Sequence, residues 1–201
     1  SADRATGAAL NPADFAQRYR APWWLPGGNA QTVWAALVAK RHFGPAPLWQ
    51  RSRWTAPDGD FIDVDTAQHP SAPGAPLLVL FHGLEGSSAS QYAVAFADFA
   101  ASRGLAFAVP HFRGCSGELN LAPRAYHSGD FHEIDWVLKR FAAEHPGRPL
   151  LAAGVSLGGN ALLRWAGEMG ESAAQTVRAV AAVCSPLDLA AGGHAIGRGF
   201  N

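Results

Sequence analysis

Four apolar runs, interrupted only by Arg178, constrain the fold of this 201-residue chain more than any other feature. They occupy residues 77–81, 105–109, 150–153 and 177–184. A run without alternating polar residues predicts a strand buried on both faces, as in a parallel sheet. Between the runs, three segments repeat apolar side chains at three- and four-residue spacing, which predicts helices. These segments are residues 90–102, 130–144 and 159–169. Such alternation forms right-handed βαβ units, so we expect an α/β fold with a doubly wound, mostly parallel sheet.

The segment before the first run predicts an antiparallel hairpin. Extended stretches between residues 48 and 67 flank Pro57, Asp58 and Gly59, a combination typical of a tight turn between two strands. We assign this hairpin to a core that comprises residues 48–201.

Residues 1–47 are predicted to form a mostly irregular, proline-rich arm, with Asn29 capping a short helix that runs to about Lys40. The arm carries Trp23, Trp24 and Trp34, which are too apolar to be left in water. We expect them to pack the arm onto the core. The alternative is an apolar patch that makes peripheral contact with lipid.

Charge and cysteine content exclude several classes of function. Sixteen Lys and Arg residues balance sixteen Asp and Glu residues without a basic run, so nucleic acid is not an expected partner. Every apolar run is far shorter than the ~20 residues that cross a bilayer. The two cysteines, Cys115 and Cys184, suit neither a disulfide framework nor a metal site, so we expect no metal, no other cofactor and a cytoplasmic setting.

Residues 154–159, Gly-Val-Ser-Leu-Gly-Gly, lie where a predicted strand turns sharply into a predicted helix. In this context the G-x-S-x-G pattern predicts a nucleophile elbow. Gly154 and Gly158 lack side chains that would collide, so Ser156 is held in a strained backbone with its hydroxyl raised above the sheet edge. The Leu157 N–H then lies at the helix N-terminus, where it stabilises a developing oxyanion. The simpler alternative is an ordinary glycine-rich turn.

Residues 82–86, His-Gly-Leu-Glu-Gly, directly follow the first apolar run. In this architecture the loop after that strand supplies a second oxyanion amide, which we expect to be the N–H of Leu84. Gly83 permits the backbone to approach closely. We expect His82 to brace the loop through hydrogen bonds rather than to transfer protons.

Five stretches together carry a family resemblance. They are residues 24–32 (WLPGGNAQT), 82–87 (HGLEGS), 111–118 (HFRGCSGE), 124–129 (RAYHSG) and the elbow. In these stretches the chain resembles the α/β-hydrolase superfamily, and within it the YheT-type branch, which includes plant embryogenesis-associated hydrolases and animal lipid-hydrolysing members. The resemblance implies that Ser156 is the nucleophile and that Leu84 and Leu157 donate the oxyanion amides. It also implies carboxylic ester substrates, such as acylglycerols.

The general base of the family pattern is missing from this chain. A serine hydroxyl needs a histidine oriented by an acid, and in this fold both follow the serine. After Ser156 the only histidine is His194, in a region where the family begins its cap. We expect Asp188 to cap a helix rather than to act as the acid. We therefore expect the last two strands, the acid and the histidine to lie beyond Asn201, at roughly 30 residues for each βα unit.

The leading hypothesis is a serine hydrolase of carboxylic esters whose activity is weak or lost in this chain alone, because the base is missing. One alternative is a non-catalytic binding module that contacts a partner or lipid through the tryptophan-rich arm and the open sheet edge. Another is an acyltransferase that uses Ser156 to pass the acyl group to an alcohol.

Overall fold

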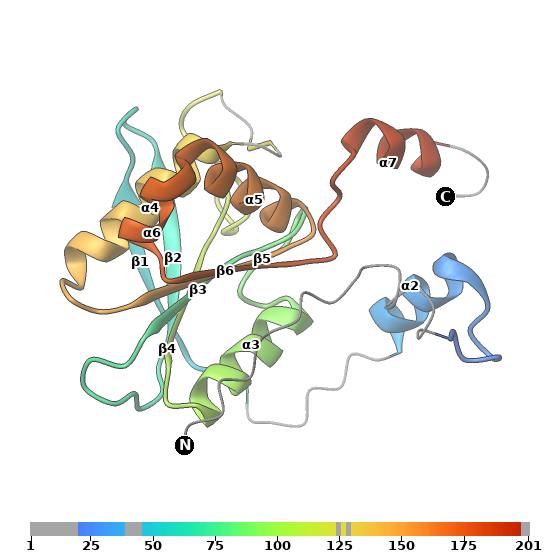
Figure 1. Ribbon diagram of the computed structural model, residues 1–201, viewed down its shortest axis with the longest axis horizontal. Coiled ribbons are helices and arrows are strands. Elements are labelled where there is room, and N and C mark those ends of the chain that lie inside the picture. Colours follow the sequence, from blue (N-terminus) through green and yellow to red (C-terminus); the bar gives the residue numbers. More distant parts are fainter. Residues whose placement is uncertain (1–19, 39–45, 124–125, 128–129, 198–201) are drawn as a thin grey trace, which may run out of the picture. The chain divides into compact units, whose positions relative to one another are not determined.

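The computed structural model describes residues 20–38, 46–123, 126–127 and 130–197 (Figure 1). The chain divides into two compact units, residues 1–41 and 42–201, and each is described by itself.

The second unit is built on a six-stranded sheet with the order β1-β2-β4-β3-β5-β6. Its strands are β1 (Trp49–Thr55), β2 (Phe61–Ala67), β3 (Leu77–Phe81), β4 (Ala106–Pro110), β5 (Leu150–Val155) and β6 (Ala179–Val183). Strand β2 pairs antiparallel with β1 and β4, whereas the pairs β4/β3, β3/β5 and β5/β6 are parallel. The predicted α/β fold, with a mostly parallel sheet and an N-terminal hairpin, is confirmed.

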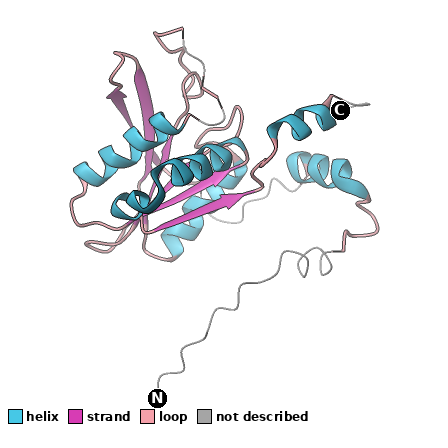
Figure 2. Cartoon of the chain, turned by 45° about the horizontal axis from the view of Figure 1, so that its top comes forward, coloured by secondary structure: helices cyan, strands magenta, loops and turns pink. Residues whose placement is uncertain are grey.

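Helices cover both faces of this sheet (Figures 1 and 2). They are α3 (Gln91–Ser102), α4 (Phe131–Glu144), α5 (Leu157–Met169) and α6 (Ala173–Thr176), with a short 3-10 turn, η1 (Gly170–Ser172). A further helix, α7 (Leu189–Ile196), follows β6 and does not cover the sheet (Figure 1). Helix α5 begins two residues earlier than predicted, because the chain enters the helix directly after Ser156. Within the described residues, no helix combines the length and the hydropathy that a membrane span requires.

Strand β3 shows how the sheet is buried on both faces. Leu77, Val79 and Phe81 pack into the core beneath α4 and α5. Leu78 and Leu80 pack on the opposite face against alanines of α3. Fully burying such a side chain stabilises the fold by ~1.5–3 kcal/mol. Strand β3 is therefore a firm anchor for the loop that follows it.

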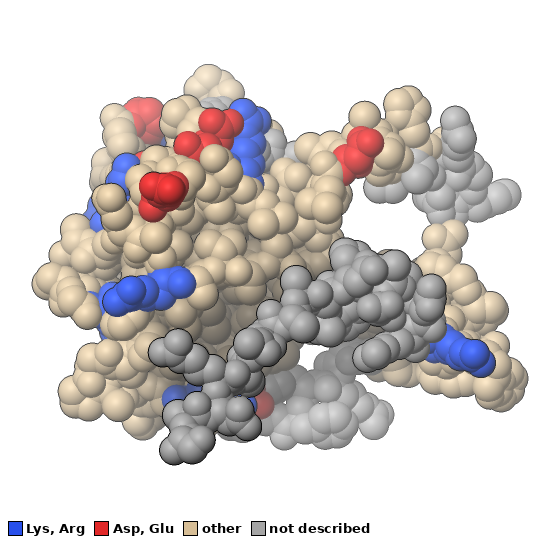
Figure 3. Space-filling model, viewed as in Figure 1, with Lys and Arg blue, Asp and Glu red and all other residues tan. Residues whose placement is uncertain are grey.

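Strand β2 carries two buried acidic side chains, Asp63 and Asp65. Across the hairpin, Arg53 faces Asp63 and Arg51 faces Asp65, each through two hydrogen bonds of 2.7–2.8 Å. Arg51 also donates to the Ser116 carbonyl at 2.6 Å, so the hairpin holds the 111–123 loop in place. On the face shown in Figure 3, basic and acidic side chains of the described residues are interspersed.

Arg113 joins three parts of the core. Its buried guanidinium donates to Asp58 (2.8 Å) and Asp60 (3.0 Å) at the hairpin turn, and to Glu133 (2.6 Å) in the first turn of α4. Burial opposes ionisation of Asp60, yet hydrogen bonds from the Leu121 N–H and other donors hold its pKa well below the usual range. Arg113 therefore holds the 111–123 loop against the hairpin turn and α4.

In the first unit, helix α2 (Gly27–Leu37) begins two residues before the predicted cap. Proline fixes φ and fits directly before a first turn, and Pro26 occupies the cap position with an extended backbone. Asn29 therefore lies inside the helix, so its prediction as the cap is wrong. Lys40, the predicted end, lies outside the described residues.

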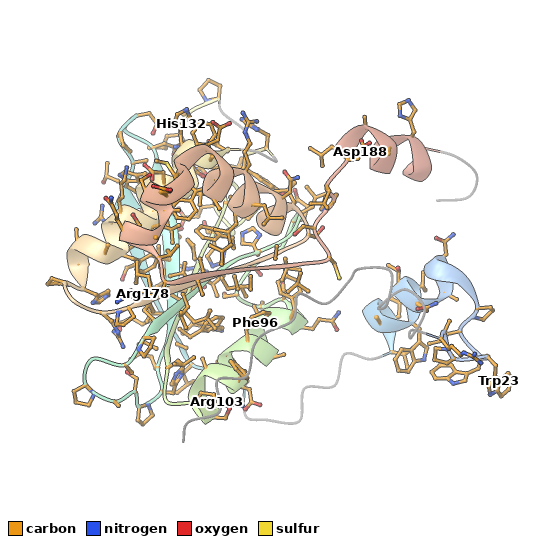
Figure 4. All side chains as sticks on the ribbon, viewed as in Figure 1. Trp23, Phe96, Arg103, His132, Arg178 and Asp188 are labelled. Atoms are coloured by element: carbon orange, nitrogen blue, oxygen red, sulfur yellow. The ribbon has the colours of Figure 1, made fainter. Side chains whose placement is uncertain are left out.

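The tryptophans of this unit differ in exposure. Trp24 packs edge-to-face on Trp34 with ring centroids 5.2 Å apart. Trp23 is 91% exposed (Figure 4). The packing of the arm against the core stays a prediction.

Replacing Arg113 with methionine tests the buried ion network. The carboxylates of Asp60 and Glu133 would lose a buried cationic partner, which lowers the free energy of unfolding by about 3–5 kcal/mol. The matched control is Lys139→Met, which removes an exposed partner of Asp135 on α4 and costs less than ~1 kcal/mol. Urea unfolding measures both. Equal losses for the two variants would contradict the role given to Arg113.

Candidate active site

Ser156 stands between β5 and α5 in a left-handed backbone conformation, with φ 51° and ψ −116°. Holding a non-glycine residue there costs about 1–3 kcal/mol, so its surroundings must impose it. Two backbone hydrogen bonds contribute: the Ser156 N–H donates to the Val183 carbonyl at 2.8 Å, and the Ser156 carbonyl accepts from the Asn160 N–H at 3.0 Å. The residue is half-buried. The sequence predicted this sharp strand-to-helix turn.

The glycines of the elbow, residues 154–159, are required by close backbone approach rather than by positive φ. A Cβ atom on Gly154 would lie 2.6 Å from the Gly158 carbonyl oxygen. A Cβ atom on Gly158 would overlap the carbonyl oxygens of Phe81 and His82. The first turn of α5 therefore packs directly on the end of β3.

The 82–86 loop reverses the chain after β3 in a tight turn. The Gly86 N–H donates to the Gly83 carbonyl at 3.0 Å, and Glu85 has the positive φ (52°) that a type II turn requires at its third position. A Cβ atom on Gly83 would lie 3.4 Å from the Ser156 Cβ. The fold thus brings the two predicted motifs into contact.

The backbone N–H groups of the loop differ in their acceptors. The Gly83 N–H donates to the Tyr92 hydroxyl and the Glu85 N–H donates to the Tyr126 hydroxyl, both at 2.9 Å. For the Leu84 N–H, the described part of the chain provides no acceptor. The N–H of Leu157, the first residue of α5, likewise has no acceptor among the described residues. Both N–H groups that the sequence singled out, those of Leu84 and Leu157, thus have no acceptor among the described residues.

His82 is fully buried at the end of β3. Its Nδ1 is 2.8 Å from the Gly83 carbonyl oxygen, and its Nε2 is 2.9 Å from the Phe112 backbone nitrogen. Because Nε2 accepts the Phe112 N–H, Nδ1 carries the proton and donates to Gly83. Burial lowers the pKa of His82 to about 4, against the opposing effect of the Gly83 carbonyl. The ring is therefore neutral at pH 7, with both nitrogens engaged.

The other candidate acid–base residues have partners of their own. His111 Nε2 lies 2.9 Å from Asp65. Asp188 accepts the Ala191 N–H at 2.8 Å in the first turn of α7, which confirms it as a cap (Figure 4). His194 lies on α7, with Nδ1 2.7 Å from the Ala190 carbonyl oxygen. Over the ranges that the structure describes, no histidine is hydrogen-bonded to the Ser156 hydroxyl.

Sequence reasoning did not single out Tyr92 or Tyr126. Tyr126 lies in one of the five family-like stretches, and that was its only signal. It also lines, with Glu85 and Cys115, a cavity of about 420 Å³ beside the 82–86 loop. Among the described residues, no three His, Cys, Asp or Glu side chains are grouped as a metal site would require.

Comparison with known proteins decides the family. A model of the alpha/beta hydrolase fold matches residues 76–197. The chain belongs to the α/β-hydrolase family. The relative YheT of Escherichia coli K12, whose name describes it provisionally as an esterase, is 41% identical over 174 residues, which cover 86% of this chain and 50% of YheT. This α/β-hydrolase is therefore of the YheT type, and it spans about half the length of that relative.

Two further comparisons concern a named phospholipase and a solved esterase structure. Phospholipase ABHD3 of Bos taurus is 33% identical over 112 residues, which cover 55% of this chain and 27% of ABHD3. The solved structure of an esterase from Pyrococcus furiosus matches with a TM-score of 0.61 at 16% identity, covering 80% of this chain and 62% of that one. This last likeness shows the shared fold.

Gly158→Ala tests the close packing of the elbow. The added methyl group would displace either α5 or the end of β3, and overpacking of this kind costs about 1–3 kcal/mol or more. Gly167→Ala on the same helix is the matched control, because a Cβ atom there meets open space. Alanine at position 167 should stabilise the helix by roughly 0.5–1 kcal/mol. Urea unfolding gives both values, and a neutral Gly158→Ala would refute the packing argument.

The buried neutral His82 makes stability depend on pH. The unfolded histidine binds its proton near pH 6.5, whereas the folded one binds it only near pH 4. Its contribution is therefore complete above pH 6.5 and is lost as the pH falls toward 4, with a loss of ~2 kcal/mol between pH 7 and pH 5. Urea unfolding at both pH values should show this loss. In His82→Gln the loss should shrink by a similar amount, and an unchanged pH dependence would contradict the assignment.

Proposed function

We propose that this chain carries the nucleophile and the oxyanion hole of a serine hydrolase that acts on carboxylic esters. The observation that carries the proposal is the strained Ser156, together with two candidate oxyanion amides, those of Leu84 and Leu157, that have no acceptor among the described residues. Gly83, Gly154 and Gly158 serve the site by allowing the loop and the elbow to touch. His82 braces the loop.

In the proposed reaction, the Ser156 Oγ attacks the ester carbonyl carbon while a base removes the hydroxyl proton. The carbonyl oxygen becomes an oxyanion and accepts hydrogen bonds from the Leu84 and Leu157 N–H groups. The bond from the carbonyl carbon to the alcohol oxygen then breaks, and the base returns its proton to the departing alcohol. Water repeats the sequence on the acyl-enzyme, which releases the carboxylic acid and regenerates the serine. No metal or other cofactor takes part.

We infer that the base is a histidine, oriented by a carboxylate, that lies outside the described residues. Three observations support this. The nitrogens of His82 and His111 are engaged elsewhere, and the chain spans about half the length of YheT. In addition, β6 is an edge strand of alanine and valine with four of its five residues exposed, which suits pairing with a further strand. Without the base, activity falls by several orders of magnitude.

The proposed substrates are small esters or lipid esters, since relatives bear the names esterase and phospholipase. The cavity beside Glu85 and Tyr126 is the described space nearest the 82–86 loop into which part of such a substrate fits. Cys115 and Cys184 are free thiols, and a cytoplasmic setting is part of the proposal.

Labelling of the full-length protein that contains this chain with a fluorophosphonate probe tests the assignment. We expect covalent modification at Ser156, located by peptide mass spectrometry, and its complete loss in Ser156→Ala. Ser172→Ala, which removes an exposed hydroxyl bonded to the Met169 carbonyl, is the matched control and should label normally. A wild-type protein that stays unlabelled would instead support a non-catalytic binding module.

Product analysis separates hydrolysis from acyl transfer. With a chromogenic ester in water, we expect the free acid as the product. Added glycerol should leave that product dominant, because water completes the proposed reaction. A new glycerol ester as the main product would show that the same serine serves acyl transfer.

A further inference from the structure

Two tyrosine hydroxyls hold the 82–86 loop from opposite sides of the sheet. Tyr92, in the first turn of α3, packs against the core on the α3 face. Tyr126 packs against the core on the α4 and α5 face. Their hydroxyl oxygens accept the N–H groups of Gly83 and Glu85, each at 2.9 Å. Those two residues immediately flank Leu84.

The Tyr126 hydroxyl makes a second bond to the same residue. It donates to the Glu85 carboxylate at 3.2 Å while it accepts the Glu85 N–H. Burial raises the pKa of Tyr126 to about 12, a shift that the Cys115 side chain also favours and the Glu85 N–H opposes, so the hydroxyl keeps its proton. These bonds join Tyr126 to Glu85, the residue of the turn with the positive φ of 52°.

Close packing surrounds both tyrosines. The Tyr126 ring stacks on Phe112 with centroids 5.3 Å apart and an interplanar angle of 7°. The Phe112 N–H in turn donates to His82. On the other side, a Cβ atom on Gly86 would overlap the Tyr92 hydroxyl, so the loop is shaped around that oxygen. Each tyrosine thus packs against the core on its own face of the sheet, and the loop fits closely against the Tyr92 hydroxyl.

We propose that Tyr92 and Tyr126 are positioning residues, which occupy the amides on either side of Leu84 and so leave its N–H aimed at the oxyanion. This inference rests on the proposed function. The two hydroxyls fix the orientation of the peptide groups 82–83 and 84–85, and the peptide group 83–84 between them carries the Leu84 N–H. A donor held in place before the reaction needs no reorganisation when charge develops.

Tyr92→Phe and Tyr126→Phe in the full-length protein test the proposal. Each substitution keeps the ring and removes only the hydroxyl. We expect kcat for a p-nitrophenyl ester to fall ~10- to 100-fold, and KM to stay within about twofold. This fall in kcat is no larger than the fall expected when an oxyanion donor is removed altogether. The Ki of a trifluoromethyl ketone, whose adduct places an oxyanion in the hole, should rise by the same factor as kcat/KM falls.

Ser102→Ala is the matched control, because it removes a hydroxyl that bonds to the Phe99 carbonyl at the far end of α3. Its kcat and Ki should equal those of the wild type. A wild-type protein that the fluorophosphonate probe does not label would overturn the proposed function itself. If the wild type is labelled and both Phe variants keep kcat and Ki unchanged, the positioning role is wrong. A shift in melting temperature alone, without a parallel change in kcat and Ki, also overturns it.

Discussion

The contact between the first turn of α5 and the end of β3 is the constraint on which the site depends. Gly158 has no side chain, so the helix backbone rests on the carbonyl groups of Phe81 and His82. This contact sets the separation between the elbow and the 82–86 loop, and with it the places of Ser156, Leu84 and Leu157. The strain at Ser156, about 1–3 kcal/mol, is smaller than the gain from burying a few side chains of β3 and α5 at ~1.5–3 kcal/mol each. The core can therefore impose it.

A second support reaches the site from the N-terminal hairpin. Arg51, Arg53 and Arg113 neutralise the buried carboxylates of β2 and its turn, and all three also bond to the 111–123 loop or lie in it. That loop supplies the Phe112 N–H to His82. The chain then continues to Tyr126, whose hydroxyl meets Glu85. The ion pairs of the hairpin are thus connected, through the 111–123 loop, His82 and Tyr126, to the loop that carries the Leu84 amide.

The parts that sequence predicted well are those determined by local pattern. Continuous apolar runs predicted β3, β4 and β5, and the G-x-S-x-G pattern predicted where β5 turns into α5. The run 177–184 predicted β6, but not that four of its five residues are exposed. The parts that escaped prediction depend on contacts between distant residues. Tyr92 and Tyr126 reach the 82–86 loop from separate parts of the chain. Asp63 and Asp65 alternate with apolar residues, a pattern typical of an exposed strand face, yet both are buried beside the 111–123 loop. Asn29 is a favourable cap residue, yet the cap position is occupied by Pro26, whose fixed φ suits the position before the first turn.

The proposed division of the reaction follows from what each group must do. Oxyanion donors act through fixed direction, so they belong on backbone held by a dense core, and each contributes roughly 10²- to 10³-fold to the rate. A general base must instead exchange protons with serine, alcohol and water in turn, and contributes about 10²- to 10⁴-fold. His82 is unsuited to that second task, because it is buried, neutral and bonded through both nitrogens. His82 instead contributes a fixed imidazole, whose two hydrogen bonds to backbone hold the loop beside Ser156 in one place.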